Sequence, residues 1–232
     1  MKRFIRLHII GEGQTEERFV KDTLASHLGL FQITTDIRRV VTSKDKIKNQ
    51  YHRGGLVNYE KAKKDIQTWL KEDKHPESYF TTMFDLYALP DDFPAYEESK
   101  AIRDPYERIR VLEKAFQENL ESQRFIPYIQ LHEFEALVLA NPANLEAEYF
   151  EHQVAIERLQ KVLREVGENP ELINDNPTTA PSKRILEVIP EYDKVNVGAS
   201  IAGINRIDFL KKKCPHFSEW LDKLEKLSDD AL

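Results

Sequence analysis

The chain opens with two kinds of hydrophobic pattern, one after the other. Residues 4–10 first alternate between polar and apolar and then become continuously apolar, as a strand buried within a sheet does. After a turn at residues 11–14, apolar residues recur at helical spacing up to Gly29. Thr15 stands where the N-cap of this helix is expected. The pattern predicts a buried strand, a turn and a helix, in that order.

The same succession of periods continues to about residue 140. We expect further strands at residues 33–42, 79–86 and 125–131, and helices at residues 59–71, 105–122 and 132–140. Strands that are separated by helices usually pair in parallel, with helices covering both faces of the sheet. The expected fold class is therefore α/β, with a mostly parallel sheet flanked by helices.

Beyond residue 140 the strand signals stop. Helices are expected at residues 155–166, 181–189, 204–213 and 216–227, with a loop rich in Asn, Pro and Thr at residues 169–181. We therefore expect an α/β core over residues 1–140 and a helical extension over residues 141–232. The extension is expected to pack on the core, so that the two parts form one structural unit.

Composition narrows the classes of protein that fit. Hydrophobic residues make up 41% of the chain and charged residues 32%, which suits a globular protein with a real core. The single cysteine, Cys214, excludes an internal disulfide and a cysteine zinc cluster, and we expect it to be inert core. The chain has neither a signal-peptide pattern nor a long apolar run, so we expect a cytoplasmic protein without membrane contact. Its oligomeric state is left open.

Acidic residues follow three of the predicted strands. Glu12 follows the first strand, Asp85 ends the third, and Glu133 and Glu135 follow the fourth. Ligands of parallel sheets collect at the carboxyl ends of the strands, so we expect these acids to meet at one edge. Glu16 should also face the sheet, because it shares a helical face with the apolar residues that follow it. Each acid alone has an ordinary reading as a turn, cap or first-turn residue.

The glycine-rich turn is not a phosphate loop of a known type. The Walker pattern is absent, and Glu16 stands where G-x-G-x-x-G needs its third glycine. A carboxylate repels a phosphate unless a cation lies between them. Mg²⁺ and Mn²⁺ prefer carboxylate oxygens and water as ligands. We therefore expect one of these ions to be held by the acids of the strand ends: Glu12, Glu16, Asp85, Glu133 and Glu135.

Basic residues suggest where a nucleic-acid backbone would lie, although the net charge of the chain is −6. Lys183 and Arg184 begin a predicted helix, where the helix dipole slightly disfavours cations, so a phosphate contact is a reasonable explanation. A second basic run extends over residues 38–53 and could follow a backbone. The nucleic-acid contacts expected from this run are Arg38, Arg39, Lys46, Lys48 and Arg53. For both groups, a solvated surface is the ordinary alternative.

The stretch GEGQTEERF resembles the first motif of the Toprim fold, found in topoisomerases, primases and overcoming-lysogenization-defect nucleases. Glu12 and Glu16 match the two metal-binding glutamates of that motif in the nuclease type. The second Toprim motif is Asp-x-Asp, and here FDLY supplies Asp85 but has Tyr87 at the second position. The resemblance therefore implies a metal site, but leaves open whether it holds one ion or two.

A closer resemblance, to the bacterial DUF4276 family, covers nearly the whole chain. It is carried in order by EGQTEERFV, FDLYALPDDFP, FIPYIQLHEFEALV, TAPSKRI and CPHFSEWLDKL. This resemblance implies a Toprim-like fold and a setting in phage defence beside an AAA-type ATPase.

Three functions from different classes follow. The leading hypothesis is a Mg²⁺- or Mn²⁺-dependent phosphodiesterase acting on nucleic acid, DNA or RNA. In it Glu12 holds the metal at the catalytic centre and Lys183 stabilises developing charge. The alternative is a non-catalytic effector or sensor subunit of an ATPase complex, with a degenerate Toprim site. A third possibility is hydrolysis of a small nucleotide, which would not need the basic run.

Overall fold

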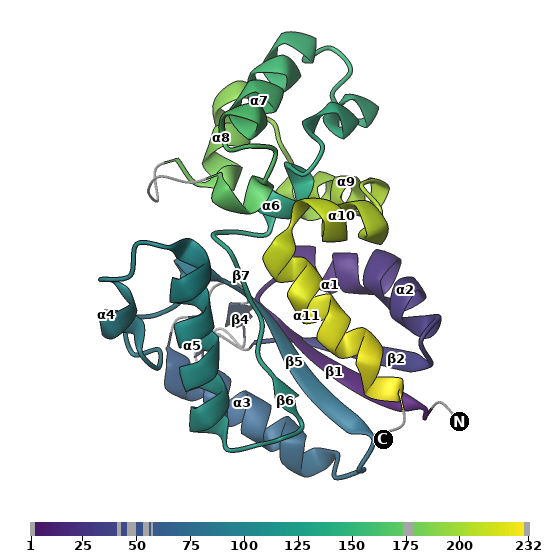
Figure 1. Ribbon diagram of the computed structural model, residues 1–232, viewed down its shortest axis with the longest axis vertical. Coiled ribbons are helices and arrows are strands. Elements are labelled where there is room, and N and C mark those ends of the chain that lie inside the picture. The colour runs from purple at the N-terminus through teal and green to yellow at the C-terminus, as the bar shows by residue number, and fades with distance from the viewer. Residues whose placement is uncertain are drawn as a thin grey trace.

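A parallel sheet forms the centre of the computed structural model, which describes residues 3–40, 43–45, 50–52, 56, 58–173 and 179–229. The strand order is β2-β1-β5-β6, and β7 also pairs with β5; all these pairings are parallel (Figure 1). The strands are β1 (Ile5–Gly11), β2 (Ile33–Arg39), β5 (Ser78–Asp85), β6 (Phe125–Ile126) and β7 (Ile129–Gln130). The predicted α/β class with a mostly parallel sheet is confirmed.

The strand β1 lies inside the sheet, with β2 on one side and β5 on the other. Its residue Ile9 pairs with Ile37 of β2 and with Thr81 of β5. A strand in this position is buried on both faces, which explains why its apolar residues become continuous rather than alternating. The hydrophobic pattern at the start of the chain therefore reflects this central place in the sheet.

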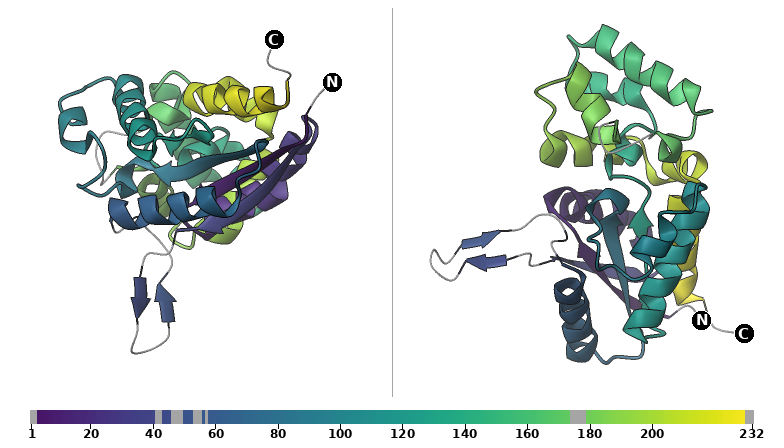
Figure 2. Two further views of the ribbon diagram at one scale, coloured as in Figure 1. Left: turned by 90° about the horizontal axis from the view of Figure 1, so that it is seen from below. Right: turned by 90° about the vertical axis from the view of Figure 1, so that its left-hand side faces the viewer.

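Helices cover both faces of the sheet, and each face has its own buried cluster. One face packs against α1 (Gln14–Phe19), the π-helical turn η1 (Val20–Leu24), α2 (Ala25–Gly29) and α11 (Pro215–Glu225). The other packs against α3 (Tyr59–Glu72) and α5 (Pro105–Leu120). Figure 2 shows α11 and α3 on opposite sides of the strands. Both helical layers are needed, because the two inner strands, β1 and β5, have apolar residues on both faces.

The remaining helices gather beyond the carboxyl ends of the strands (Figure 1). They are α6 (Glu135–Val138), η3 (Pro142–Ala147), α7 (Gln153–Glu165), η4 (Pro170–Leu172), α8 (Pro181–Val188), the π-helical turn η5 (Lys194–Gly198), α9 (Ala199–Ile204) and α10 (Ile207–Lys213). Residues of α7, α8, α9 and α10 belong to the same buried cluster as residues of β1. The helical part therefore shares its core with the sheet.

Smaller elements complete the chain. The short helical segments are η2 (Leu86–Ala88), α4 (Tyr96–Ser99) and η6 (Lys226–Ser228). The strands β3 (Ser43–Asp45) and β4 (Gln50–His52) form an antiparallel pair that projects from the body of the molecule (Figure 2). Within the part of the chain that the structure describes, no helix has the length and apolar character needed to cross a membrane.

The first helix begins two residues earlier than expected. Its N-cap is Gly13, with an extended backbone, and Thr15 is buried inside the first turn. The Gly13 amide donates to Oε2 of Glu16 at 2.7 Å, which supplies the return half of a capping box. The prediction of Thr15 as the cap was wrong because Gly13 can enter the helix closer to the strand end.

The strand predicted at residues 125–131 lies at the edge of the sheet and is divided into β6 and β7. Pro127, between the two, has no backbone N–H to donate. The next two amides donate to side chains: Tyr128 N to Oγ1 of Thr82 at 3.1 Å, and Ile129 N to Oε1 of Glu113 at 2.9 Å. These two side chains accept the hydrogen bonds that a neighbouring strand would otherwise accept. The buried amides therefore keep a partner although the strand is broken.

Two other helices begin later than expected, and several helical segments were not expected at all: α4, η3, η4 and the segment from η5 to α9. The helix predicted at residues 132–140 is only α6, and the helix predicted at residues 204–213 begins at Ile207. Before each of them stands a residue with positive φ: His132 at 63° and Arg206 at 59°. A right-handed helix cannot pass through this conformation. The segment from η5 to α9 gave no recognisable helical signal in the sequence.

The contact between α11 and the sheet depends strongly on Trp220. Its indole Nε1 donates to Oγ1 of Thr81 at 2.9 Å, and its ring stacks on Tyr128 with centroids 4.3 Å apart. We expect Trp220→Ala to lower the free energy of unfolding by about 3–5 kcal/mol, since it leaves a large cavity and an unpaired hydroxyl. Urea denaturation measures this. Trp220→Phe should be clearly milder, and equal losses in both variants would contradict the importance of ring packing.

Candidate active site

The carboxylate of Glu12 lies at the carboxyl ends of two neighbouring strands. Glu12 directly follows β1, and its Oε2 accepts a hydrogen bond from the backbone N–H of Asp85 at 3.1 Å. Its own amide donates to the carbonyl of Met83 at 3.3 Å. The residue is thereby held by β5 through both its backbone and its side chain. The first and third strand ends do meet, as their positions in the sequence predicted.

Glu16 lies over the turn that follows β1 and is 4% exposed. A Cβ atom at Gly11 would lie 3.3 Å from Cβ of Glu16 and 3.2 Å from Cδ1 of Ile37. The glycine therefore allows the helix to approach the strand closely. The next acid, Glu17, points elsewhere and pairs with Arg39, with Oε2 2.7 Å from Nε. The expected inward direction of Glu16 is confirmed.

Asp85 and Glu135 complete the group of acids, in which Glu12 is half-buried and the other three are buried. Asp85 is the last residue of β5, and Glu135 is the first residue of α6 with no solvent exposure. Glu133 lies between them in the chain, but its Oε2 accepts the amide of Ser182 at 2.9 Å and so caps the start of α8. We call Glu12, Glu16, Asp85 and Glu135 the carboxylate cluster.

A lysine that was not among the expected site residues lies within this cluster. Nζ of Lys194 is 3.1 Å from Oε2 of Glu135 and 3.8 Å from Oδ2 of Asp85. Lys194 begins η5, whose N-terminus is capped by Asp193 through the amides of Val195 and Asn196. Nothing in the sequence distinguishes Lys194 from a surface lysine, because the contact depends on two segments that are 59 or more positions apart in the chain.

Burial and mutual repulsion disfavour the charged forms of these acids. Desolvation, followed by the charge of Glu16, raises the pKa of Glu12 to about 7. Desolvation also raises the pKa of Glu135 to about 7 and that of Glu16 above its usual range. The pKa of Asp85 lies well above its usual value, again through burial and then through Glu12. One positive charge from Lys194 therefore leaves this group undercompensated.

Burial disfavours the ammonium of Lys194, but the acids around it more than offset that effect. Asp85 and Glu135 are the largest contributors and raise the pKa of Lys194 above its ordinary value. The lysine is thus a permanent cation, and its side chain remains 42% exposed. A long, partly exposed side chain of this kind can move its ammonium away from the acids without unfolding the site.

The donors of the carboxylate cluster are of the kind that Mg²⁺ and Mn²⁺ prefer. Oε1 of Glu135 is buried and accepts no hydrogen bond from any residue in the described ranges, so it is available to a further cation or donor. Across those same ranges, however, no three or more His, Cys, Asp or Glu side chains stand in an arrangement that could hold a metal ion. The chemistry of the donors fits a divalent ion, and their spacing requires Lys194 and the carboxylates to shift.

The basic residues that were expected to contact nucleic acid lie on two different elements, and some fall outside the described residues. Lys183 is exposed on α8, and Nε of Arg184 donates to the carbonyl of Thr179 at 3.0 Å. Among the described residues, Lys194 rather than Lys183 makes the ion pairs of the carboxylate cluster. Arg38 and Arg39 end β2, beside β1. Three further expected contacts lie outside the described residues: Lys46, Lys48 and Arg53.

Tyr87, which stands where the Asp-x-Asp motif has its second aspartate, contacts His132 instead of offering a carboxylate. Tyr87 donates its backbone N–H to the carbonyl of His132 at 3.2 Å, and the two rings stack with centroids 5.4 Å apart. Burial, followed by Arg108, lowers the pKa of His132 to about 4. Tyr87 and His132 therefore form an uncharged wall rather than a further pair of ligands.

A model of the family described as "Domain of unknown function (DUF4276)" matches residues 11–225, which is nearly the whole chain. The protein belongs to this family. The match covers the carboxylate cluster, Lys194 and the helices that carry them. No significant match was found among the curated proteins or among the solved structures.

A second residue of this DUF4276 protein that the sequence did not indicate is Tyr192. Its side chain is 7% exposed, and its hydroxyl has no hydrogen-bond partner within the described part of the chain. A Cβ atom at Gly198 would lie only 2.5 Å from that hydroxyl, so a glycine is needed there. Burial and then the charge of Glu135 raise the pKa of Tyr192, which keeps the hydroxyl protonated as a donor near the cluster.

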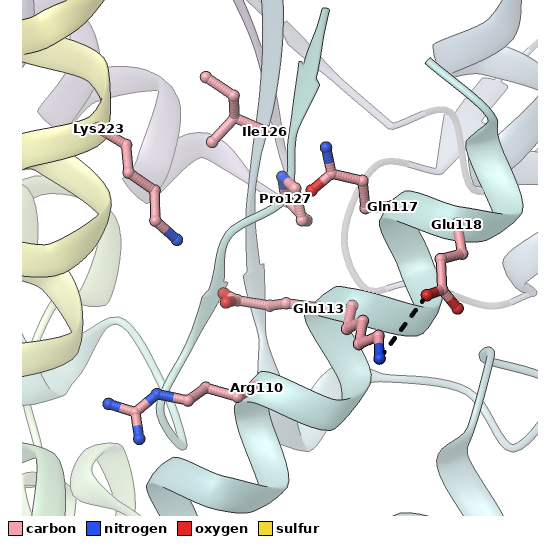
Figure 3. A pocket seen from close by; sticks show the side chains of 8 residues that line it. Arg110, Glu113, Gln117, Glu118, Ile126, Pro127 and Lys223 are labelled. Carbon is pink, nitrogen blue, oxygen red and sulfur yellow. Dashed lines mark ion pairs between the residues drawn. The ribbon is translucent and has the colours of Figure 1, made fainter. Parts of the chain in front are cut away.

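A cavity of about 620 Å³ lies away from these acids, at the edge strand between α5 and α11 (Figure 3). Ile126 and Pro127 are on the strand side, Lys223 comes from α11, and α5 supplies Arg110, Glu113, Lys114, Gln117 and Glu118. Charges of both signs line it, and Glu113 is occupied by the amide of Ile129 and by His216. The volume of this cavity alone therefore does not identify it as the functional site.

The raised pKa values predict how stability depends on pH. The pKa of Glu135 is 4.5 in the unfolded chain and about 7 in the folded protein. Its charge therefore lowers the free energy of unfolding progressively as pH rises from 4.5 to 7, and the whole loss is present above pH 7. We expect Glu135→Gln to raise the free energy of unfolding at pH 8 by roughly 1–3 kcal/mol, with little change at pH 5. Denaturation at both pH values tests this, with the exposed Glu157→Gln as control. Destabilisation of Glu135→Gln at pH 8 would show that the Lys194 ion pair outweighs the desolvation of Glu135.

Proposed function

We propose that this DUF4276 protein is a divalent-cation-dependent phosphodiesterase that acts on nucleic acid, with a Toprim-like site. The observation that supports this most is the carboxylate cluster itself. Acids from the ends of β1 and β5 and from the start of α6 surround Lys194; Glu12 is half-buried, Asp85 and Glu135 are buried, and desolvation and mutual repulsion raise their pKa values. Such a group is stabilised by an added cation, and perturbed acids in this arrangement are typical of functional sites.

The residues that would hold Mg²⁺ or Mn²⁺ are Glu12, Asp85 and Glu135, with Glu16 and Glu133 beside them. When bound, such an ion polarises a phosphate and lowers the pKa of a bound water. Burial raises the pKa of Glu12 to about 7 when no ion is present, and a bound ion would hold this side chain as the carboxylate that serves as its ligand. Lys194 supplies the positive charge nearest to the acids, and we propose that it contacts a non-bridging phosphate oxygen.

The basic residues outside the cluster would position the nucleic acid. Lys183 and Arg184, at the start of α8, and Arg38 and Arg39, at the end of β2, lie on elements that adjoin the carboxyl edge of the sheet. Phosphate contacts of this kind orient a strand but carry no sequence information. A role in bacterial phage defence, with an AAA-type ATPase as partner, belongs to the same proposal and is supported only by the resemblance described above.

The enzymatic proposal predicts a metal-dependent cleavage that Glu12 controls. Purified protein should nick or degrade DNA or RNA with Mn²⁺, and Glu12→Gln should reduce the rate by at least about a hundredfold, since it removes a charged ligand of the ion. Gel analysis of plasmid DNA and of a long single-stranded RNA measures this. Glu17→Gln is the control, because Glu17 is nearby but pairs with Arg39 instead. Equal cleavage by wild type and Glu12→Gln would indicate a contaminating nuclease and refute the assignment.

A second candidate function is favoured by the position of Lys194. Its ammonium already lies among the acids as a built-in cation, and no metal-holding group was found among the described residues. On this view the site is degenerate, and the protein is a non-catalytic effector or sensor subunit of an ATPase complex. The two functions differ in whether the acids accept a divalent ion.

Calorimetry with Mg²⁺ and Mn²⁺ separates the two candidates. The enzymatic proposal predicts that wild type binds at least one of these ions. It further predicts that Lys194→Met binds it about tenfold more tightly, because a competing charge near the carboxylates is removed. Lys183→Met is the matched control and should leave the affinity unchanged. Absence of binding by both folded wild type and Lys194→Met would favour the subunit function.

A further inference from the structure

A small cavity of about 180 Å³ lies at the carboxyl end of β2, between this strand and α3. It is lined by Ile10, Arg38, Arg39, Val40, Asp65, Thr68 and Trp69. We propose that this Arg38 cavity receives one nucleobase of a single-stranded substrate. The proposal rests on the nucleic-acid function proposed above and adds to it the class of substrate strand.

Arg38 forms a flat, charged platform at this cavity. Its guanidinium carbon lies 4.1 Å from the centre of the Trp69 ring, and its Nη1 donates a hydrogen bond to Oε2 of Glu72 at 2.7 Å. One face of the guanidinium is therefore covered by the indole, while the side chain as a whole remains 52% exposed. A guanidinium that is fixed in this way can stack on the face of a base as well as attract a phosphate.

The indole beneath the guanidinium is itself firmly held. Trp69 is 3% exposed and contacts the rings of His8 and Phe80, with centroids 4.6 Å and 6.0 Å away. Arg38 therefore rests on a rigid aromatic stack rather than on a mobile side chain. The platform is ready before any ligand arrives, which lowers the entropy lost on binding.

The Arg38 cavity adjoins the carboxylate cluster through direct backbone contact. The amide of Val40 donates to the carbonyl of Gly11 at 3.0 Å, and Gly11 is the residue before Glu12. Neighbouring strands are about 4.8 Å apart, so the end of β2 lies next to the acids. A base in the cavity would thus belong to a nucleotide close to the phosphate at the cluster.

The size and lining of the cavity indicate a single base rather than a base pair. Its volume is below the roughly 300–1,000 Å³ of pockets for drug-sized ligands, which suits one ring system. Ile10 and Val40 give it apolar walls, and Thr68 on α3 brings a hydroxyl oxygen. A base inside a duplex is stacked and paired on both sides and cannot enter such a cavity without being extruded. A single strand presents its bases freely.

A binding experiment without divalent cations tests this inference apart from catalysis. Fluorescence anisotropy in EDTA would compare three labelled ligands of equal length: oligothymidylate, an abasic deoxyribose-phosphate strand, and a DNA duplex. We expect wild type to bind oligothymidylate about tenfold more tightly than the abasic strand, which is the range of one stacked base. The duplex should bind more weakly than oligothymidylate.

Two arginine variants show whether Arg38 provides this preference. Arg38→Lys keeps the charge but loses the planar group, so it should bind oligothymidylate and the abasic strand equally. Arg110→Lys is the matched control, since Arg110 is also about half exposed and paired with a glutamate, at 2.9 Å from Glu219. The preference of wild type should persist in Arg110→Lys.

Each outcome separates the base cavity from the proposed enzyme. Equal affinity of wild type for oligothymidylate and the abasic strand, or equal affinity for the duplex, would overturn the base cavity and leave phosphate binding intact. A preference that survives in Arg38→Lys would overturn the role of Arg38. A clear base preference in a protein that cleaves nothing with Mn²⁺ would support the cavity and refute the phosphodiesterase. No binding to any ligand in EDTA would overturn the base cavity, and cleavage with Mn²⁺ would then decide on the phosphodiesterase alone.

Discussion

The repulsion between buried carboxylates at the carboxyl edge of the sheet is the constraint on which the site of this DUF4276 protein depends. Glu12, Asp85 and Glu135 lie where water is largely excluded, and their pKa values are raised because the folded protein disfavours their charge. Lys194 offsets part of that effect with a single positive charge. A site that remains short of positive charge is suited to bind a further cation, or to hold protons at neutral pH.

The fold brings these groups together by two different routes. The parallel sheet aligns the ends of β1 and β5, and the close approach at Gly11 places Glu16 above them. The helical part then adds Glu135 at the start of α6 and Lys194 at the start of η5. Because that part shares its buried core with β1 and α11, its residues are held against the sheet edge rather than attached as a loose appendage. Both routes are needed for the acids to meet their cation.

The two candidate functions differ in what compensates the acids. In the enzyme, Lys194 gives way to a divalent ion and then neutralises a phosphate; in the subunit, Lys194 is the permanent partner of Glu135 and Asp85. The platform of Arg38 on Trp69 lies one strand away from the same acids. In the proposed recognition of a single strand, the acids would bind the phosphate through a cation, and the guanidinium on Trp69 would bind the base.

Local patterns in the sequence predicted the strands of the parallel sheet, most of the longer helices and the direction of Glu16, because hydrophobic period and helix geometry depend on near neighbours. They also placed Glu12 and Asp85 at one edge, since parallel strands share their direction. They did not predict the pair β3–β4. They did not reveal the break at Pro127, the late start of α6 after His132, or the role of Lys194 and Tyr192. Those features arise where segments far apart in the chain pack together, and only the tertiary structure decides which distant charge meets which.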